Sequence, residues 1–315
     1  MPGLPTSLLI KADLRVLLAQ SLQPNAPTGS LSAQARQRAK QWAIAANLLD
    51  DRGLTPEGNL VATKDPYLEA TVTDWLIHFY LSLNDRSLWH YFMCEFLPNH
   101  SSFTQEELVN SCIETFPIES PETLKKSIRL ILRTYTESEA IAKIGFLRQD
   151  KKIYSISSPD LSNPYTTGYL FAKLWEYNYN IRASVLVNEI LDTDMGLVSV
   201  LGINKAQLRQ QLDILEKHEI IEQRSAKPHL AGTKPQTKDD DEFPYQVHRC
   251  WDTAIELLKK AYENDMATPN RPLIQSLGEI LDDDDNIPDF SQFLEWASRL
   301  IALDGGSNTI VKLVS

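Results

Sequence analysis

Two pairs of titratable side chains in one short stretch of the sequence have a spacing that could support chemistry. Asp74 and His78 are four positions apart, so on a helix their side chains can pair, and a carboxylate orients a histidine for proton transfer. Asp65 and Glu69 have the same spacing, and two such carboxylates could hold the metal ion that a nuclease needs. We favour structural roles for both pairs: a polar contact inside a buried helix for Asp74 and His78, and a helix cap for Asp65.

Two groups of basic and amide side chains could contact DNA. The first lies on a helix that follows residues 201–204 (LGIN), which read as the tight turn of a helix-turn-helix motif. Its predicted DNA-facing side chains are Lys205, Gln207, Arg209 and Gln210. The same helix carries acidic residues that repel phosphate, namely Asp213, Glu216 and Glu219. A helix that packs against a protein, with solvated charges, is therefore the alternative.

The second group combines a predicted basic helix with a predicted basic β-hairpin. The helix carries Lys125, Lys126, Arg129 and Arg133, and the hairpin carries Arg148, Lys151 and Lys152. A basic helix beside a basic hairpin can contact phosphates on both sides of a DNA groove. An ordinary solvated surface is the alternative for this group too.

These candidate sites depend on a central stretch, residues 64–97, that we expect to form a helical hairpin. Asp65 and Pro66 read as a helix start, because a short acceptor side chain precedes a proline whose fixed φ suits the first turn. Apolar residues then recur with helical spacing as far as Leu83 and leave few polar positions, so we expect neighbours to bury this helix on several sides. A second, short aromatic helix should end at Pro98.

The flanking segments predict a mainly α-helical protein, built from tandem winged-helix-like modules around the central helical hairpin. The second module has two helices followed by two short apolar strands with a polar basic turn, whereas the first and third have helices followed by a single short strand. The predicted divisions are 1–64 (first winged-helix-like module), 65–100 (central hairpin), 101–162 (second module), 163–224 (third module), 225–245 (linker or mobile wing) and 246–315 (helical C-terminal unit).

The composition is that of an ordinary globular protein. A net charge of −11 argues against a protein that coats nucleic acid without specificity, although local basic faces are compatible with it. No apolar run reaches the ~20 residues of a membrane span, and three separated cysteines without CxxC spacing favour a reducing, cytoplasmic setting. We predict no cofactor, apart from Mg²⁺ if the chain nicks DNA, and leave enzyme activity open because no catalytic motif occurs.

The central stretch also carries a family resemblance. Residues 65–69 (DPYLE), followed by residues 75–79 (WLIHF), resemble the core motif of the DUF4007 family. Residues 133–135 (RTY) fall where that family has a similar Arg-x-Tyr segment, and the resemblance covers roughly residues 30–225. It implies a bacterial setting of DNA phosphorothioate modification and phage defence, beside a cysteine desulfurase and a sulfurtransferase, and some members are described as DNA-nicking components.

The chain departs from the family pattern at its start. The family's leading segment, with its His-Glu-Thr-Phe-like motif, has no counterpart before Leu31. Any activity that rests on that segment is therefore not carried over to this chain.

Three functional hypotheses follow. The first is a component that binds double-stranded DNA and docks sulfur-transfer machinery on it, with nicking as a further option and with a sulfurtransferase and an ATPase as protein partners. The second is a non-catalytic scaffold whose winged helices bind proteins. The third is a sequence-specific DNA-binding regulator. A steep salt dependence of DNA affinity separates the first and third hypotheses from the second.

Overall fold

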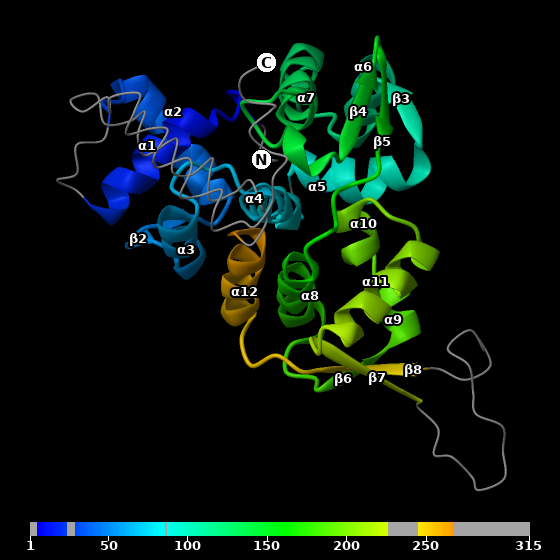
Figure 1. The fold of residues 1–315 in the computed structure, drawn as a ribbon. Helices are drawn as coiled ribbons and strands as arrows, with labels where there is room; N and C mark the ends of the chain where they lie inside the picture. Colours follow the sequence, from blue (N-terminus) through cyan, green and yellow to red (C-terminus); the bar gives the residue numbers. More distant parts are fainter. Residues whose placement is uncertain (1–4, 24–28, 86, 226–244, 267–315) are drawn as a thin grey trace, which may run out of the picture. The chain divides into compact units, whose positions relative to one another are not determined.

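The computed structural model describes residues 5–23, 29–85, 87–225 and 245–266. Its internal contacts divide the chain into two compact units, Met1–Tyr262 and Glu263–Ser315, and almost all the described residues belong to the first. Within the described ranges the protein has twelve α-helices and three small antiparallel sheets (Figure 1). The prediction of a mainly α-helical protein is confirmed.

The N-terminal part consists of three helices and a two-stranded ribbon. Their bounds are α1 Lys11–Leu22, α2 Ala33–Ala45, β1 Leu49–Asp50, β2 Gly53–Leu54 and α3 Pro56–Lys64. Ser32 caps α2 by accepting a hydrogen bond from the amide of Ala35, and Thr55 caps α3 by accepting one from the amide of Gly58. Helix α1 packs against both α2 and α3.

The middle of the chain contains the central hairpin and a helix–helix–ribbon unit. The hairpin consists of α4 Thr71–Leu83, α5 Leu88–His90, a π-helical turn Tyr91–Phe96 and a 3-10 turn Leu97–Asn99. The next unit consists of β3 Ser102–Thr104, α6 Gln105–Thr115, α7 Pro121–Thr136, a 3-10 turn Ala142–Ile144, β4 Leu147–Asp150 and β5 Ile153–Ile156. Its sheet has the order β3-β5-β4, and α7 packs against α6 and β4.

The remaining described residues form a second helical unit with its own sheet. The elements are α8 Pro164–Tyr179, β6 Ser184–Leu186, α9 Val187–Asp192, α10 Leu197–Leu201, α11 Lys205–Lys217, β7 Ile221–Ser225, β8 Tyr245–Arg249 and α12 Ala254–Met266. The sheet has the order β6-β8-β7. Gly202 ends α10 in the left-handed conformation, at φ 64, and so makes the tight turn that leads into α11. Most of the predicted linker and of the predicted C-terminal unit lies outside the described residues.

Helix α4 begins later than the sequence suggested. Asp65 ends α3 instead of starting α4, and the chain then forms a loop in which Leu68 has φ 54. The residue before a proline disfavours the helical conformation, and here that residue is Asp65. Pro66 therefore follows the end of α3 and does not open the next helix. The predicted cap of α4 by Asp65 is wrong, because α4 has Ala70 as its N-cap and no side-chain cap. The Asp65 carboxylate instead accepts hydrogen bonds from the amides of Glu69 and Ala70, 2.9 Å each, in the loop before the helix.

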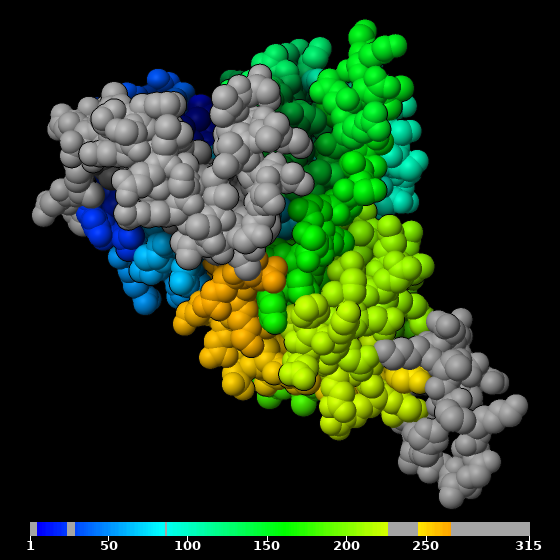
Figure 2. Space-filling model, in the orientation of Figure 1, coloured from blue at the N-terminus to red at the C-terminus, as the bar shows by residue number. Residues whose placement is uncertain are grey.

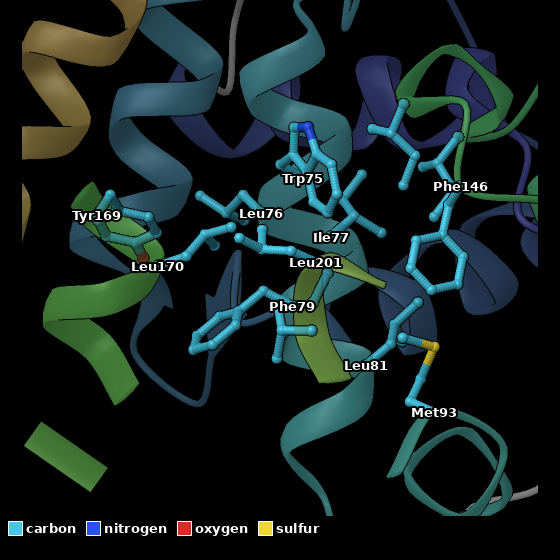
Figure 3. Close-up of a cluster of buried hydrophobic side chains, with 14 of the residues drawn as sticks. Trp75, Leu76, Ile77, Phe79, Leu81, Met93, Phe146, Tyr169, Leu170 and Leu201 are labelled. Carbon is cyan, nitrogen blue, oxygen red and sulfur yellow. The ribbon is translucent and has the colours of Figure 1, made fainter. Parts of the chain in front are cut away.

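The core is organised around α4, as its apolar pattern predicted. Ten of its residues are buried, and they include polar as well as apolar side chains. Side chains of α8, α10 and the segment before β4 surround it, among them Leu170, Leu201 and Phe146 (Figure 3). Among the described helices, none is long and apolar enough to cross a membrane.

We expect Gly58→Ala to destabilise the fold. A Cβ atom at this position, in the first turn of α3, would lie 1.9 Å from the carbonyl oxygen of Leu48, so backbone has to move. The free energy of unfolding, measured by urea denaturation, should fall by about 3 kcal/mol, although alanine otherwise favours a helix by about 1 kcal/mol. Gly29→Ala is the control, because its nearest neighbour would be Val16 Cγ2 at 4.0 Å. Equal stability of the two variants would contradict the close approach of α3 to Leu48.

Candidate functional site

His78 lies at the centre of a buried hydrogen-bond chain. Its Nε2 is 2.7 Å from the carbonyl oxygen of Val200, and its Nδ1 is 2.8 Å from the hydroxyl of Tyr135. Because a carbonyl oxygen only accepts, Nε2–H donates to Val200, and Nδ1 accepts from Tyr135. The Tyr135 oxygen in turn accepts from Trp89 Nε1–H at 2.9 Å. The imidazole is therefore neutral and fully bonded, and it joins α4 to α5, α7 and α10.

Burial lowers the pKa of His78 to about 4, although its bond to the Val200 carbonyl favours the protonated ring. A histidine with both nitrogens occupied and a low pKa is a poor proton shuttle near neutral pH. This environment suits a structural role, in which the ring fixes the positions of four helices.

Asp74 is also completely buried, but its partner comes from the N-terminal helix. Its Oδ1 pairs with Lys11 Nζ, and within the described residues no hydrogen-bond donor reaches Oδ2. Burial raises the pKa of Asp74 to about 7, and Lys11 opposes the rise. The predicted pairing of Asp74 with His78 is wrong, because the ring nitrogens of His78 are bonded to Tyr135 and Val200.

Asp65 and Glu69 diverge instead of converging on one point. Both oxygens of Asp65 are occupied: Oδ1 accepts from the amide of Glu69, and Oδ2 accepts from the amide of Ala70 and from Thr73 Oγ1 at 2.6 Å. Glu69 points to the surface, where it pairs with Lys143. Thr73 also bonds the hydroxyl of Tyr262 at 2.9 Å, so the Asp65 loop holds α12 as well as α4. The two carboxylates do not form the metal-binding pair that their spacing suggested.

Two features of this polar centre were missed by the sequence analysis. Lys11 is buried against α4, and the signal for it is a cation in helical register with the apolar residues Leu14 and Leu18. The other feature is a third buried carboxylate, Glu57 in α3, which accepts a hydrogen bond from the Tyr80 hydroxyl at 2.9 Å and faces the Tyr169 hydroxyl at 3.3 Å. No local pattern indicates this contact, since its residues come from three separate helices.

The basic face consists of six exposed cations on α7 and on the β4–β5 hairpin: Lys125, Lys126, Arg129, Arg148, Lys151 and Lys152. None of them has an ion-pair partner among the described residues. Helix α7 packs beside β4, so the elements that carry these cations are neighbours (Figure 1). The hairpin projects from the surface at the upper edge of Figure 2.

Not every residue predicted for this group belongs to the basic face. Arg133 is half-buried and pairs with Glu137 one helical turn later, so its charge is already balanced. Glu122 and Asp150 are exposed on the same elements and reduce the local positive charge. Six cations against these two acids leave a positive surface on a chain whose overall charge is negative.

The turn of the hairpin is strained at a lysine. Lys151 has φ 55 in the two-residue turn between β4 and β5. The left-handed region costs a side-chain-bearing residue roughly 1 kcal/mol, and turns of this kind favour glycine or asparagine. The Gln149 amide supports the turn by donating to the Lys151 carbonyl at 2.9 Å. Such strain at an exposed position motivates the hypothesis that the lysine side chain has a use that glycine could not supply.

The first predicted group, on α11, has less free charge. Lys205 Nζ is 2.5 Å from Asp192 Oδ1, and the side chain of Gln207 bonds the amide of Asn204 at 2.9 Å to complete a capping box. Arg209 is partly buried, whereas Gln210 is exposed. The first predicted group therefore lies on α11, whereas the second is divided between α7 and the β4–β5 hairpin and has more cations without an ion-pair partner among the described residues.

Comparison with known proteins gives one family and one kind of fold. The model of a family described as "Protein of unknown function (DUF4007)" matches residues 39–227. The solved structure "SspB crystal structure" is similar with a TM-score of 0.60 at 18% identity, over 84% of this chain and 88% of that chain. "Magnesium ion-bound SspB crystal structure" is similar with a TM-score of 0.61 at 15% identity, over 95% of this chain and 94% of that chain. These likenesses show the fold alone. No curated protein matches the chain.

The two buried titratable groups of α4 should act oppositely on stability. The pKa of Asp74 is about 7 in the folded protein against 3.8 for the free side chain. Its contribution to the free energy of unfolding therefore falls as the pH rises from 3.8 to about 7. The pKa of His78 is about 4 against 6.5, so its contribution rises with pH between these values. We expect Asp74→Asn to remove the decrease in the free energy of unfolding that Asp74 causes as the pH rises. The variant's free energy of unfolding, relative to the wild type, should then increase by the order of 4 kcal/mol from pH 4 to pH 7.

The measurement is urea unfolding at a series of pH values. Asp85→Asn is the control, because Asp85 is exposed at the end of α4. A stability difference between Asp74→Asn and the wild type that does not change with pH would show that Lys11 keeps Asp74 ionised throughout.

Proposed function

The chain belongs to the DUF4007 family, as its central motif predicted, and from that premise we propose that it docks on DNA for a bacterial phosphorothioate modification and phage-defence system. The setting is the one that the family resemblance implies. In this proposal the chain holds double-stranded DNA and brings the sulfur-transfer machinery to it. Its protein partners are the sulfurtransferase and the ATPase of such a system.

The basic face carries the DNA part of this proposal. Six cations without ion-pair partners in the described part of the chain lie on two elements that pack together. Phosphate contacts of this kind supply most of the affinity of a protein for DNA and position it on the duplex. The strained Lys151 adds to the argument, because a surface turn has no packing reason to prefer lysine to glycine.

We propose further that β3, α6, α7 and the β4–β5 hairpin form a winged-helix module. The helices α6 and α7 lead directly into the hairpin, whose strand β5 pairs with both β3 and β4. In such a module the second helix approaches a DNA groove while the hairpin contacts the adjacent backbone. Helix α7 would then present Lys125, Lys126 and Arg129 to DNA.

A second function, protein binding, is favoured for the unit that contains α11. Lys205 is balanced by Asp192, and Gln207 is used to cap its own helix. Asp213 and Glu216 on the same helix both bond Gln223 of β7. A surface whose charges are balanced internally meets a protein at a lower desolvation cost than a surface of free cations does. We therefore propose that DNA binds one unit and a protein partner binds the other.

Strand nicking is the part of the original hypothesis that the residues support least. A magnesium-dependent nuclease needs carboxylates that converge on an ion, and one of the similar structures is described as magnesium ion-bound. Asp65 and Glu69 do not fit such an ion, because the first is bonded on both oxygens and the second pairs with Lys143. We derive no nicking step from them. Relaxation of supercoiled plasmid in Mg²⁺, on samples deproteinised before electrophoresis, remains the test of nicking.

Reversal of charge on α7 should weaken DNA binding. For Lys126→Glu combined with Arg129→Glu, we expect the affinity for a duplex of about 30 base pairs to fall at least tenfold at 0.1 M salt, because two phosphate contacts become repulsive. The wild type should also lose affinity steeply as salt rises, with a log–log slope of about −4 to −5 if most of the basic face contacts phosphate. Fluorescence anisotropy with labelled DNA measures both quantities.

The control has the same change of net charge on the other helix. Lys205→Glu combined with Lys217→Glu reverses two exposed lysines of α11. Its affinity should stay within about threefold of the wild type at the same salt. A greater loss from the α11 variant than from the α7 variant would move the DNA site to α11. No binding by the wild type at low salt would refute DNA docking and favour the scaffold.

Lys151→Gly should raise stability and lower DNA affinity together. Glycine relieves the left-handed strain, so the free energy of unfolding should increase by roughly 1 kcal/mol, while one phosphate contact disappears. Lys152→Gly is the matched control, since it removes the same charge from a residue that has no positive φ. It should lower affinity without raising stability. If Lys151→Gly were more stable but bound DNA as well as the wild type, the lysine would have no role in binding.

A further inference from the structure

A pocket of about 260 Å³ lies between the N-terminal segment, helix α2 and the central hairpin. Aromatic side chains line it: Trp42 of α2, Tyr80 of α4 and Trp89 of α5. Ala45, the last residue of α2, lines it from an exposed position. None of the described residues that line the pocket carries a charge. The pocket therefore suits a neutral ring system rather than a phosphate group.

The aromatic walls of the pocket are fixed by hydrogen bonds to residues outside it. Trp89 Nε1–H donates to the Tyr135 hydroxyl at 2.9 Å, and the Tyr80 hydroxyl donates to Glu57 at 2.9 Å, but neither acceptor lines the pocket. The rings of Trp42 and Trp89 are perpendicular, with centroids 5.6 Å apart at 89°. A flat ring that stacks on one of them meets the other edge-on, and both geometries are favourable. A pocket fixed in this way does not have to order its walls when a ligand binds.

Three polar side chains of the pocket have hydrogen-bonding groups to spare. Thr6, Ser7 and Gln41 line the pocket, and their side chains make no hydrogen bond to any described residue. None of the three is buried. Hydroxyl and amide groups both donate and accept hydrogen bonds. An apolar side chain from a partner protein would leave them unused, whereas the edge of a nucleobase carries donors and acceptors that can satisfy them.

The pocket is connected to the helix of the basic face. The hydroxyl of Ser127 in α7 donates a hydrogen bond to the carbonyl oxygen of Pro5 at 3.1 Å, and Pro5 is part of the pocket wall. Ser127 directly follows Lys126 of the basic face. Beside the other wall, Lys40 of α2 is exposed and has no ion-pair partner in the described part of the chain. Cations on these two helices can hold the sugar-phosphate backbone of a strand whose base enters the pocket.

We infer that the pocket binds one nucleobase that has left the base stack of the bound DNA, and this inference rests on the proposed DNA docking. The base lies against the two tryptophans, and its edge meets Gln41 and the hydroxyls of Thr6 and Ser7. Proteins that hold an unstacked base combine aromatic stacking with hydrogen bonds to its edge in this way. A volume of about 260 Å³ is slightly less than that of a drug-sized ligand site, so the pocket holds one base and not a stretch of strand.

The test compares duplexes that differ only in the presence of an unpaired base. An unpaired base is the least costly to unstack, so DNA with an adenine in a single-nucleotide bulge should bind best. The same bulge with an abasic nucleotide keeps the flexibility of the duplex but offers no base. We expect the full-length wild type to bind the adenine bulge about tenfold more tightly than the abasic bulge, as measured by fluorescence anisotropy with labelled DNA.

Two variants of α2 and one control connect this difference to the pocket. Ala45→Trp fills the pocket with an indole ring, so the two bulged duplexes should bind within about twofold of each other while the affinity for a fully paired duplex is unchanged. Gln41→Ala leaves the pocket open and should reduce the difference to about threefold through the loss of hydrogen bonds to the base. Gln37→Trp is the matched control, because Gln37 is exposed on the same helix and does not line the pocket. It should keep the tenfold difference.

The outcomes separate the pocket from DNA docking itself. Equal affinity of the wild type for the two bulged duplexes, or an undiminished difference in Ala45→Trp, would overturn the base pocket and leave DNA docking intact. Failure of the wild type to bind any of the three duplexes at low salt would refute the docking and the base pocket together.

Discussion

Helix α4 is buried along most of its length, and the polar side chains on it must therefore find partners inside the protein. Burying an unpaired charge or hydrogen-bonding group costs several kcal/mol. Asp74 takes Lys11 from α1, His78 takes Tyr135 and Val200 from α7 and α10, and Thr73 connects Asp65 to α12. Each partner comes from a different part of the chain. The cost of leaving these groups unsatisfied thus specifies how the surrounding helices are arranged around α4.

This constraint explains why the residues that looked most reactive have structural roles. A proton shuttle needs a free nitrogen and a pKa near the working pH, but burial and two hydrogen bonds deprive His78 of both. A metal site needs carboxylate oxygens that converge, but those of Asp65 are bonded to backbone amides of the loop before α4. The motif that carries the family resemblance is therefore a folding element, which holds α3, α4 and α12 together.

The cations without ion-pair partners among the described residues lie instead on the surface, on α7 and on the β4–β5 ribbon. One face of that ribbon packs against the core. Stacking of Tyr154 on Phe103 anchors the inner side, and the outer side carries Ile153 and Arg148. If it contacts DNA as we propose, a ribbon anchored in this way would lose little conformational entropy on binding.

The sequence by itself determined the helical class, the buried central helix and the family, because apolar periodicity and the DPYLE and WLIHF motifs are local patterns. It also identified the cations of α7 and the hairpin as a group. It did not determine where α4 starts, since the left-handed Leu68 and the hydrogen bond from the Glu69 amide to Asp65 depend on how the loop folds. Only the tertiary structure decided which partner each polar side chain takes. Lys11 and Asp74, or His78 and Val200, are far apart in the chain, and no local spacing records that burial has brought them together.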